Sequence, residues 1–141
     1  MPKPIKILIV DDHALVREGI RAMVGLQEGI EVVGEAEDGL QAIEMTRTLS
    51  PDVVLMDIAM PKYGGLEATL EIKKKYKDAK VLILSQYDDP QYLDRFLKAG
   101  VSGYILKKAL GSELVSAIRA VAAGESYLHP SLTANVIERY L

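Results

Sequence analysis

The feature that most constrains the fold of this chain is a repeated alternation between short apolar runs and longer segments with helical spacing. Five of the runs are rich in Val, Ile and Leu, and most lack the apolar–polar alternation of a half-exposed strand. Unalternating runs of this kind are typical of strands buried on both faces of a parallel sheet. The predicted strands span residues 5–10, 30–36, 52–56, 80–85 and 102–106.

The segments between the runs favour helices, and several carry signals for helix ends. Asp38 precedes the second helical segment as an N-cap. Gly100 and Gly124 stand where left-handed caps would end the fourth and fifth segments. Pro130 then interrupts the chain, and Ser131 is a candidate cap for a short terminal helix. In the first helical segment the apolar residues that favour one face are Leu15, Ile20, Met23, Val24 and Leu26.

Strand and helix alternate five times, which predicts an α/β fold, a three-layer (βα)5 sandwich with right-handed crossovers. The strand order is not visible in the sequence itself. A flavodoxin-like parallel sheet of order 2-1-3-4-5 would make the first, third, fourth and fifth strands neighbours. With 141 residues, of which 49% are apolar, the chain suits one domain with its own core.

Composition excludes several classes of function. A formal net charge of -3 argues against a nucleic-acid-binding surface on this chain, because phosphate backbones select for clustered Lys and Arg. The absence of cysteine excludes disulfides, thiolate metal sites and cysteine catalysis. No apolar run approaches the length of a membrane span. We therefore expect a soluble, cytoplasmic protein with no membrane partner.

Polar residues follow four of the predicted strands at the point where each strand ends. Asp11 and Asp12 follow the first, Asp57 the third, Ser85 the fourth and Lys107 the fifth. Open parallel sheets bind ligands at the carboxyl ends of their strands, so the order 2-1-3-4-5 would bring these groups into one crevice.

The chemistry of this set indicates a metal ion and a phosphoryl group. Three close carboxylates repel one another unless one is protonated or a cation joins them, and all-oxygen ligands favour a hard ion such as Mg²⁺. His13 is the one nearby nitrogen ligand, and we expect it to be a cap-region or surface residue. A lysine and a hydroxyl suit phosphoryl oxygens, while a GxxxxGK[ST] nucleotide loop is absent. The set fits phosphoryl transfer onto an aspartate.

Each of these residues alone has an ordinary structural explanation. Asp11 and Asp12 could cap the helix that begins near Ala14. Asp57 could accept hydrogen bonds from loop amides, and Lys107 could be a solvated cation. The joint placement at four strand ends is much harder to attribute to accident, and this conjunction is the functional signal.

Four motifs resemble the receiver domain of bacterial two-component response regulators. They are VDDH after the first strand, VVLMDIAMP around the third, LS closing the fourth and GYILK on the fifth. The resemblance covers residues 5–124, and DDHALVREGIRAMV, GEAEDGLQAI and GESYLHPSL are similar to the NarL/FixJ subfamily. It implies a receiver domain at 1–124 and a linker with a short C-terminal helix at 125–141. The LuxR-type helix-turn-helix output domain of that subfamily is expected to be absent from this chain.

The resemblance assigns the carboxylates to phosphate and metal. It implies that Asp57 accepts a phosphoryl group from a phosphohistidine on a sensor histidine kinase. Mg²⁺ (or Mn²⁺) would be bound by the carboxylates of Asp12 and Asp57 and the backbone carbonyl of Ala59, with Asp11 helping through a water. Such a domain is a regulatory switch in transcription rather than an enzyme, because it catalyses only its own phosphorylation and dephosphorylation.

The resemblance also implies a switching mechanism. Lys107 would pair with Asp57 and then with a phosphoryl oxygen, while Ser85 would donate its hydroxyl and move toward the phosphoryl group. Tyr104 would swing inward into the vacated space and bias the surface of the fourth helix, fifth strand and fifth helix. DNA would be contacted only through the output domain. A homodimer on phosphorylation, with residues 92–100 as a candidate face, is left open.

Four positions depart from the usual pattern of the family: Gln86, Gly64, Tyr63, which stands where Met is common, and Lys108, which stands where many receivers have Pro. Gln86 follows Ser85 where many receivers carry a small residue, and its longer side chain could narrow the entry to Asp57. Gly64 precedes Gly65 where Asp or Asn is usual, so the third helix lacks its ordinary cap. That loss costs a few tenths to about 1 kcal/mol if nothing compensates.

Two other functions stay open on the sequence alone. A phosphatase that turns over through an aspartyl-phosphate has similar chemistry, but such hydrolases typically place two acids as DxD after the first strand, whereas Asp11 and Asp12 are adjacent. An interaction module that signals without phosphate would not need the complete set of acids, hydroxyl and lysine.

Overall fold

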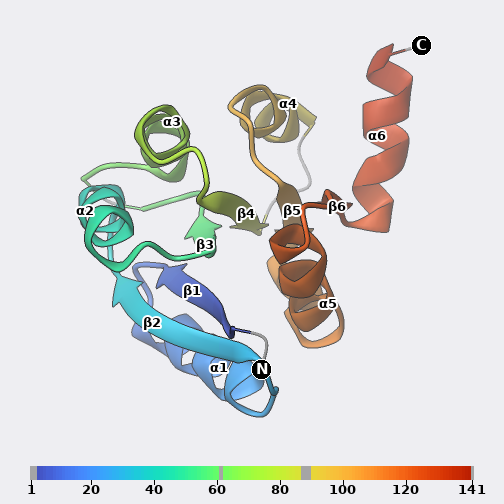
Figure 1. Cartoon of the computed structure of the whole chain (residues 1–141). Coiled ribbons are helices and arrows are strands. Elements are labelled where there is room, and N and C mark those ends of the chain that lie inside the picture. Colours follow the sequence, from blue (N-terminus) through green and yellow to red (C-terminus); the bar gives the residue numbers. More distant parts are fainter. Residues whose placement is uncertain (1–2, 61, 87–89, 141) are drawn as a thin grey trace.

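The sheet at the centre of the molecule has six parallel strands in the order β2-β1-β3-β4-β5-β6 (Figure 1). The computed structural model describes residues 3–60, 62–86 and 90–140 of the chain. The predicted order 2-1-3-4-5 is confirmed, and a sixth strand adds to it. The strands are β1 Ile5–Val10, β2 Ile30–Ala36, β3 Val53–Asp57, β4 Lys80–Ser85, β5 Gly103–Leu106 and β6 Tyr127–Leu128.

Helices cover both faces of the sheet and give the three layers that the sequence predicts (Figure 1). α1 and α5 pack on one face, and α2, α3, α4 and α6 pack on the other. Across the described residues, none of the helices is long and apolar enough to cross a bilayer. The helices are α1 Ala14–Gly25, α2 Gly39–Leu49, α3 Gly65–Lys75, α4 Pro90–Lys98, α5 Leu110–Ala122 and α6 Pro130–Tyr140, with a 3₁₀ turn, η1, at Lys107–Ala109.

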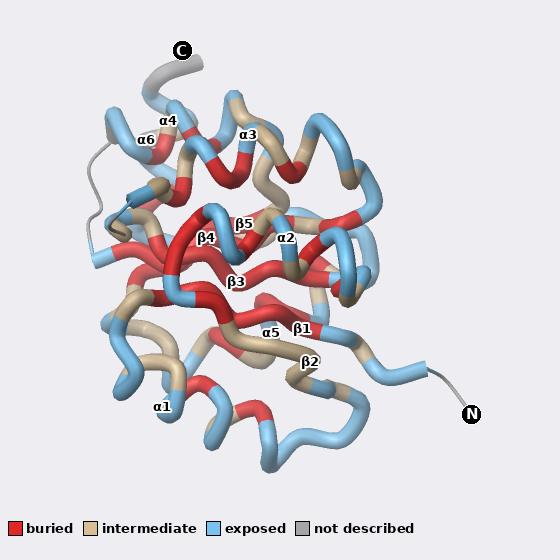
Figure 2. Tube along the Cα trace, turned by 90° about the vertical axis from the view of Figure 1, so that its left-hand side faces the viewer, coloured by how far each residue is buried: buried red, intermediate tan, exposed pale blue. Residues whose placement is uncertain are grey.

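Successive residues of each inner strand point to opposite layers, so one strand fills two cores. In β1, Ile7 and Ile9 pack toward α1 and α5, whereas Leu8 and Val10 pack toward the opposite layer. All four side chains are fully buried, and Figure 2 shows the inner strands as a buried layer between helices with exposed outer surfaces, with the edge strand β2 only partly buried. Burial on both faces is the reason that the apolar runs do not alternate.

β2 forms one edge of the sheet and departs once from regular pairing. Ile7 pairs with Val32, but Leu8 pairs with Gly34, so Val33 is an extra residue on β2. A bulge of this kind bends a strand and increases its local twist.

The helix ends follow the predicted signals at three of four positions. Asp38 caps α2, and its carboxylate accepts a backbone N–H three residues on at 2.9 Å. Gly100 and Gly124 have the positive φ of left-handed caps, 93° and 91°. The prediction for Ser131 is wrong, because α6 begins at Pro130, whose fixed φ suits a first helical turn.

The prediction of the packed face of α1 is partly wrong. Ile20 and Val24 are buried as expected, but Leu15 is 79% exposed and Leu26 is 86% exposed. Ile20 and Val24 are one helical turn apart and define the stripe that meets the sheet. Leu15 lies off that stripe, and Leu26 follows the last helical residue, Gly25.

The residues after α5 complete the sheet and cover α4. β6 pairs with the outer edge of β5, with Leu128 opposite Tyr104. α6 then contacts α4, and Leu132 is fully buried in the same core as Leu93 and Phe96. Leu93 and Phe96 are therefore packed inside the domain, whereas Tyr92 and Leu97 of the same helix are exposed. Leu132, in the segment predicted to be a linker and a short helix, belongs to the same core.

Leu132→Ala tests whether α6 belongs to the folded domain. We expect the substitution to lower the free energy of unfolding by about 2–5 kcal/mol, because it leaves a cavity in a closed core. Urea unfolding followed by circular dichroism measures the change. Ile137→Ala on the same helix is the control, since Ile137 is 53% exposed and should change stability by about 0.5 kcal/mol or less. Equal effects of the two substitutions would contradict the packing of α6.

Candidate functional site

The carboxyl ends of four neighbouring strands bring the predicted site residues to one edge of the sheet. Asp11 follows β1 directly, Asp57 is the last residue of β3, and Ser85 is the last residue of β4. Lys107 follows β5 and opens η1. The order of the sheet makes these strands neighbours, so residues far apart in sequence share one site.

Lys107 lies between two buried carboxylates. Its Nζ is 3.0 Å from Asp11 Oδ2 and 3.1 Å from Asp57 Oδ1. Both aspartates are buried, and Asp11 is completely inaccessible. The ammonium group therefore joins the ends of β1, β3 and β5.

Burial raises the pKa of Asp57, and the Asp11 carboxylate adds to this rise, while Lys107 opposes it. Burial alone would lower the pKa of Lys107, but its hydrogen bond to Asp11 and the charge of Asp57 outweigh burial and raise that pKa. The lysine is therefore held as a cation, whereas ionisation of Asp57 is disfavoured.

The acidic cluster has more negative charge than Lys107 balances. One ligand atom from each of Asp11, Asp12, His13 and Asp57 lies within 4.8 Å of all the others. Asp12 Oδ1 is buried and accepts no hydrogen bond, and His13 Nδ1 lies 3.1 Å from it. Three carboxylates beside one ammonium, with an unbonded oxygen, form a group that could bind a divalent cation.

The space in front of Asp57 is small. A cavity of about 60 Å³ is lined by His13, Asp57, Ile58, Ala59 and Gln86. Small-molecule sites usually enclose roughly 300–1,000 Å³, so this space suits an ion and a small group rather than a nucleotide. Ala59 and Gln86 are exposed at its mouth.

Ser85 and Tyr104 occupy buried positions on the two strands beyond β3. Ser85 is completely inaccessible at the end of β4. The Tyr104 ring is also fully buried, and it meets Phe96 of α4 edge to face at a centroid distance of 6.2 Å. Tyr104 is therefore already inward in this structure.

Asp11 also has an ordinary structural role in the loop before α1. Asp11 Oδ1 accepts the backbone N–H of His13 at 2.8 Å, which fixes the loop before α1. His13 occupies the N-cap position of α1 without a side-chain cap bond, as expected of a cap-region residue, but it also lines the cavity.

The prediction for Gly64 is confirmed, since no side chain caps α3 there, although Glu67 puts a favourable charge in its first turn.

Two residues that support the site were not predicted. Arg17 donates to the backbone carbonyl of Asp11 at 2.6 Å, and its Nε donates to Glu35 of β2 at 3.1 Å. Gly65 packs against β3 so closely that a Cβ there would lie 2.3 Å from the Asp57 carbonyl oxygen. The sequence held a signal for Arg17, because this arginine stands one turn into the helix that follows an acidic pair. It held no signal for the role of Gly65.

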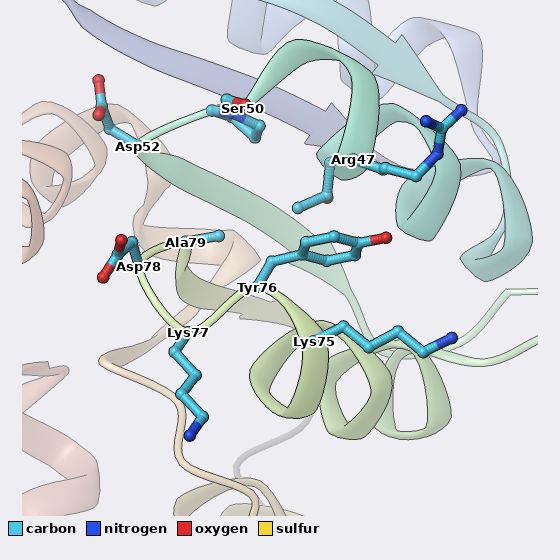
Figure 3. Close-up of a pocket in the computed structure, with 10 residues that line it drawn as sticks. Arg47, Ser50, Asp52, Lys75, Tyr76, Lys77, Asp78 and Ala79 are labelled. Carbon is cyan, nitrogen blue, oxygen red and sulfur yellow. The ribbon is translucent and has the colours of Figure 1, made fainter.

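A larger cavity of about 330 Å³ lies away from this chemistry, at the opposite end of the sheet (Figure 3). It lies between the C-terminal ends of α2 and α3, and none of the predicted site residues lines it. The cations Arg47 and Lys75 at this cavity already form ion pairs with Glu44 and Glu71 on their own helices. Volume alone therefore does not identify the functional site.

Comparisons with known proteins agree with the geometry. The model of the response regulator receiver domain matches residues 7–119. The transcriptional regulatory protein DegU of Brevibacillus brevis is 46% identical over 136 residues, which cover 96% of this chain and 58% of that protein. This chain spans 58–64% of the length of the first curated relatives that it matches.

Two solved structures share the fold along almost the whole chain. A LuxR-family two-component response regulator from Aurantimonas sp. SI85-9A1 has a TM-score of 0.92 and 36% identity, covering 98% of this chain and 99% of that one. The isolated REC domain of RcsB from Salmonella enterica serovar Typhimurium, in the presence of the phosphomimetic BeF3-, has a TM-score of 0.86 and 28% identity, covering 94% and 99%. This chain therefore belongs to the response regulator receiver domain family, and within it to the NarL/FixJ type.

Proposed function

We propose that this domain is the phosphoacceptor switch of a longer, cytoplasmic transcriptional regulator. The observation that carries the proposal is the Asp57 carboxylate, buried at the end of β3 beside Lys107 and two further aspartates. Its proposed donor is the phosphohistidine of a sensor histidine kinase. The domain is regulatory, and we propose that it catalyses only its own phosphorylation and dephosphorylation.

Asp57 is the proposed nucleophile. One of its carboxylate oxygens attacks the phosphorus of the phosphohistidine, the P–N bond breaks, and its electron pair stays on the imidazole, which takes up a proton. Lys107, 3.1 Å from Asp57 Oδ1, neutralises charge on the phosphoryl oxygens. Ser85 donates its hydroxyl to one of those oxygens. Gln86, exposed beside the same cavity, limits access to it.

The acidic cluster is the proposed site of Mg²⁺ or Mn²⁺. Asp12 and Asp57 would be carboxylate ligands, the Ala59 carbonyl a third protein ligand, and Asp11 would act through a water. A bound divalent ion supplies positive charge that reduces repulsion between the carboxylates and the phosphoryl group. The buried, unbonded Asp12 Oδ1 supports this proposal.

The proposed output is a change of surface around α4, β5 and α5. Because Tyr104 is already buried against Phe96, the switch would act on the packing of this ring within the core. DNA binding would belong to an output domain elsewhere in the longer protein. One relative is named a transcriptional regulatory protein, and one similar solved structure is that of an RcsB–DNA complex. Formation of a homodimer on phosphorylation is a further part of the proposal.

Asp57→Asn tests the phosphoacceptor directly. We expect wild-type protein incubated with Mg²⁺ and acetyl phosphate to gain one phosphoryl mass, because Asp57 is the nucleophile. We expect Asp57→Asn to gain none. Intact-protein mass spectrometry measures the change, with Asp78→Asn, an exposed acid away from the site, as the control. Absence of Mg²⁺-dependent modification in the wild type would refute the proposed function.

The same substitution should stabilise the metal-free protein. Folding raises the pKa of Asp57. The stabilisation that comes from binding a proton at Asp57 is therefore complete below the ordinary aspartate pKa of about 4, and it is lost as the pH rises through the higher pKa of the folded state. Asp57→Asn should therefore raise the free energy of unfolding near neutral pH by roughly 1 kcal/mol, and this gain should shrink in acid. Urea unfolding in EDTA at both pH values tests it. Destabilisation near neutral pH would contradict the electrostatic account.

Gln86→Ala tests control of access. Removal of this side chain should open the cavity to water and speed loss of the phosphoryl group by about fivefold, which corresponds to a barrier lower by ~1 kcal/mol. The decay of phosphorylated protein, followed by mass spectrometry, measures the rate. Gln27→Ala, at an exposed position after α1, is the matched control. An unchanged rate in Gln86→Ala would show that Gln86 does not limit access.

A further inference from the structure

The segment that follows α5 is hydrogen-bonded to β5, the strand that leads into Lys107. The Tyr127 N–H donates to the Ser102 carbonyl at 3.0 Å, and the His129 N–H donates to the Tyr104 carbonyl at 3.1 Å. The backbone of Tyr104 is therefore tied to the C-terminal segment as well as to the sheet.

The same segment is bonded to α5, the helix that leads away from Lys107. Glu113 stands in the first turn of α5. The Tyr127 hydroxyl donates to Glu113 Oε1 at 2.7 Å, and His129 Nδ1 is hydrogen-bonded to Glu113 Oε2. Burial, followed by the bond to Glu113, raises the pKa of Tyr127 to about 12. We call the cluster formed by Glu113, Tyr127 and His129 the clasp.

The clasp fixes the start of α6. The Leu132 N–H donates to the His129 carbonyl at 2.9 Å, and the Leu132 side chain is buried in the core that contains Phe96 and Tyr104. Figure 1 shows β6 beside β5, with α6 continuing from it near α4. The position of α6 is therefore set by the two elements that flank Lys107.

Occupancy of the site would disturb this arrangement through Lys107. A phosphoryl group on Asp57 and an ion must fit a cavity of about 60 Å³, and the ammonium now lies 3.1 Å from Asp57 Oδ1. A contact between Lys107 and the phosphoryl oxygens would shift the ammonium from its present position between the two carboxylates. η1 and the first turn of α5 follow Lys107 directly, so Glu113 lies on the element that a displacement of Lys107 would act on.

We propose that the clasp couples the Asp57 site to the docking of α6, so that occupancy of the site loosens α6 from α4. This inference rests on the proposed function of Asp57. Coupling between two equilibria is reciprocal. A variant that opens the clasp must therefore bind the phosphoryl mimic more tightly than the wild type does, by at most the factor by which the mimic shifts the docking equilibrium of α6.

The experiment measures both sides of this linkage in the intact chain. Affinity for beryllofluoride in saturating Mg²⁺ is measured by calorimetry, and hydrogen exchange of α6 is measured with and without beryllofluoride. The clasp variants are Glu113→Gln, which removes the charge, and Tyr127→Phe, which removes only one hydroxyl. Glu125→Gln is the matched control, because Glu125 is exposed in the same segment and makes the same change of charge.

We expect beryllofluoride to speed exchange in α6 of the wild type. We also expect Glu113→Gln to bind beryllofluoride roughly fivefold more tightly, at the lower end of ordinary allosteric coupling, with a smaller change in the same direction for Tyr127→Phe and none for Glu125→Gln. Unchanged or weaker binding in both clasp variants overturns the clasp and leaves the proposed function standing. Wild-type protein that binds no beryllofluoride overturns both.

Discussion

The contact of one ammonium group with two buried carboxylates is the interaction on which the rest of the site depends. Lys107 reaches both Asp11 and Asp57, and these residues come from the ends of three strands. Without that cation the cluster of acids would be repulsive, and ends of strands are the part of a sheet least held by neighbouring hydrogen bonds. The sheet brings the charges together, and the charges in turn hold the loops at its edge.

The supporting contacts act on backbone rather than on the carboxylates themselves. Arg17 holds the carbonyl of Asp11 to the end of β2 through Glu35, and Gly65 lets α3 approach the carbonyl of Asp57. Acidic groups kept close against their mutual repulsion need such rigid backbones, because a mobile loop would separate them. Repulsion among the acidic groups lowers stability at the site, and burial of apolar side chains in the two cores on either side of the sheet compensates for that loss.

The fold and the meeting of the candidate site residues at one edge could be predicted because both follow from short patterns. Runs buried on both faces identify the strands, and acids, hydroxyl and lysine at their ends identify the edge at which these groups meet. β6 could not be predicted, because two residues, Tyr127 and Leu128, are too few to show a pattern. The exposure of Leu15 and the role of Gly65 depend on which elements meet, and no local pattern contains that information.

The two outer strands have a consequence for self-association. An uncovered strand edge offers free N–H and C=O groups to which another chain can add. β6 pairs with the outer side of β5 and is itself only two residues long, which leaves little length for addition of a strand. At the other edge β2 carries the extra residue Val33, which bends the strand and spoils a continuous ladder. The sheet is thus terminated on both sides, and growth into larger intermolecular sheets is disfavoured.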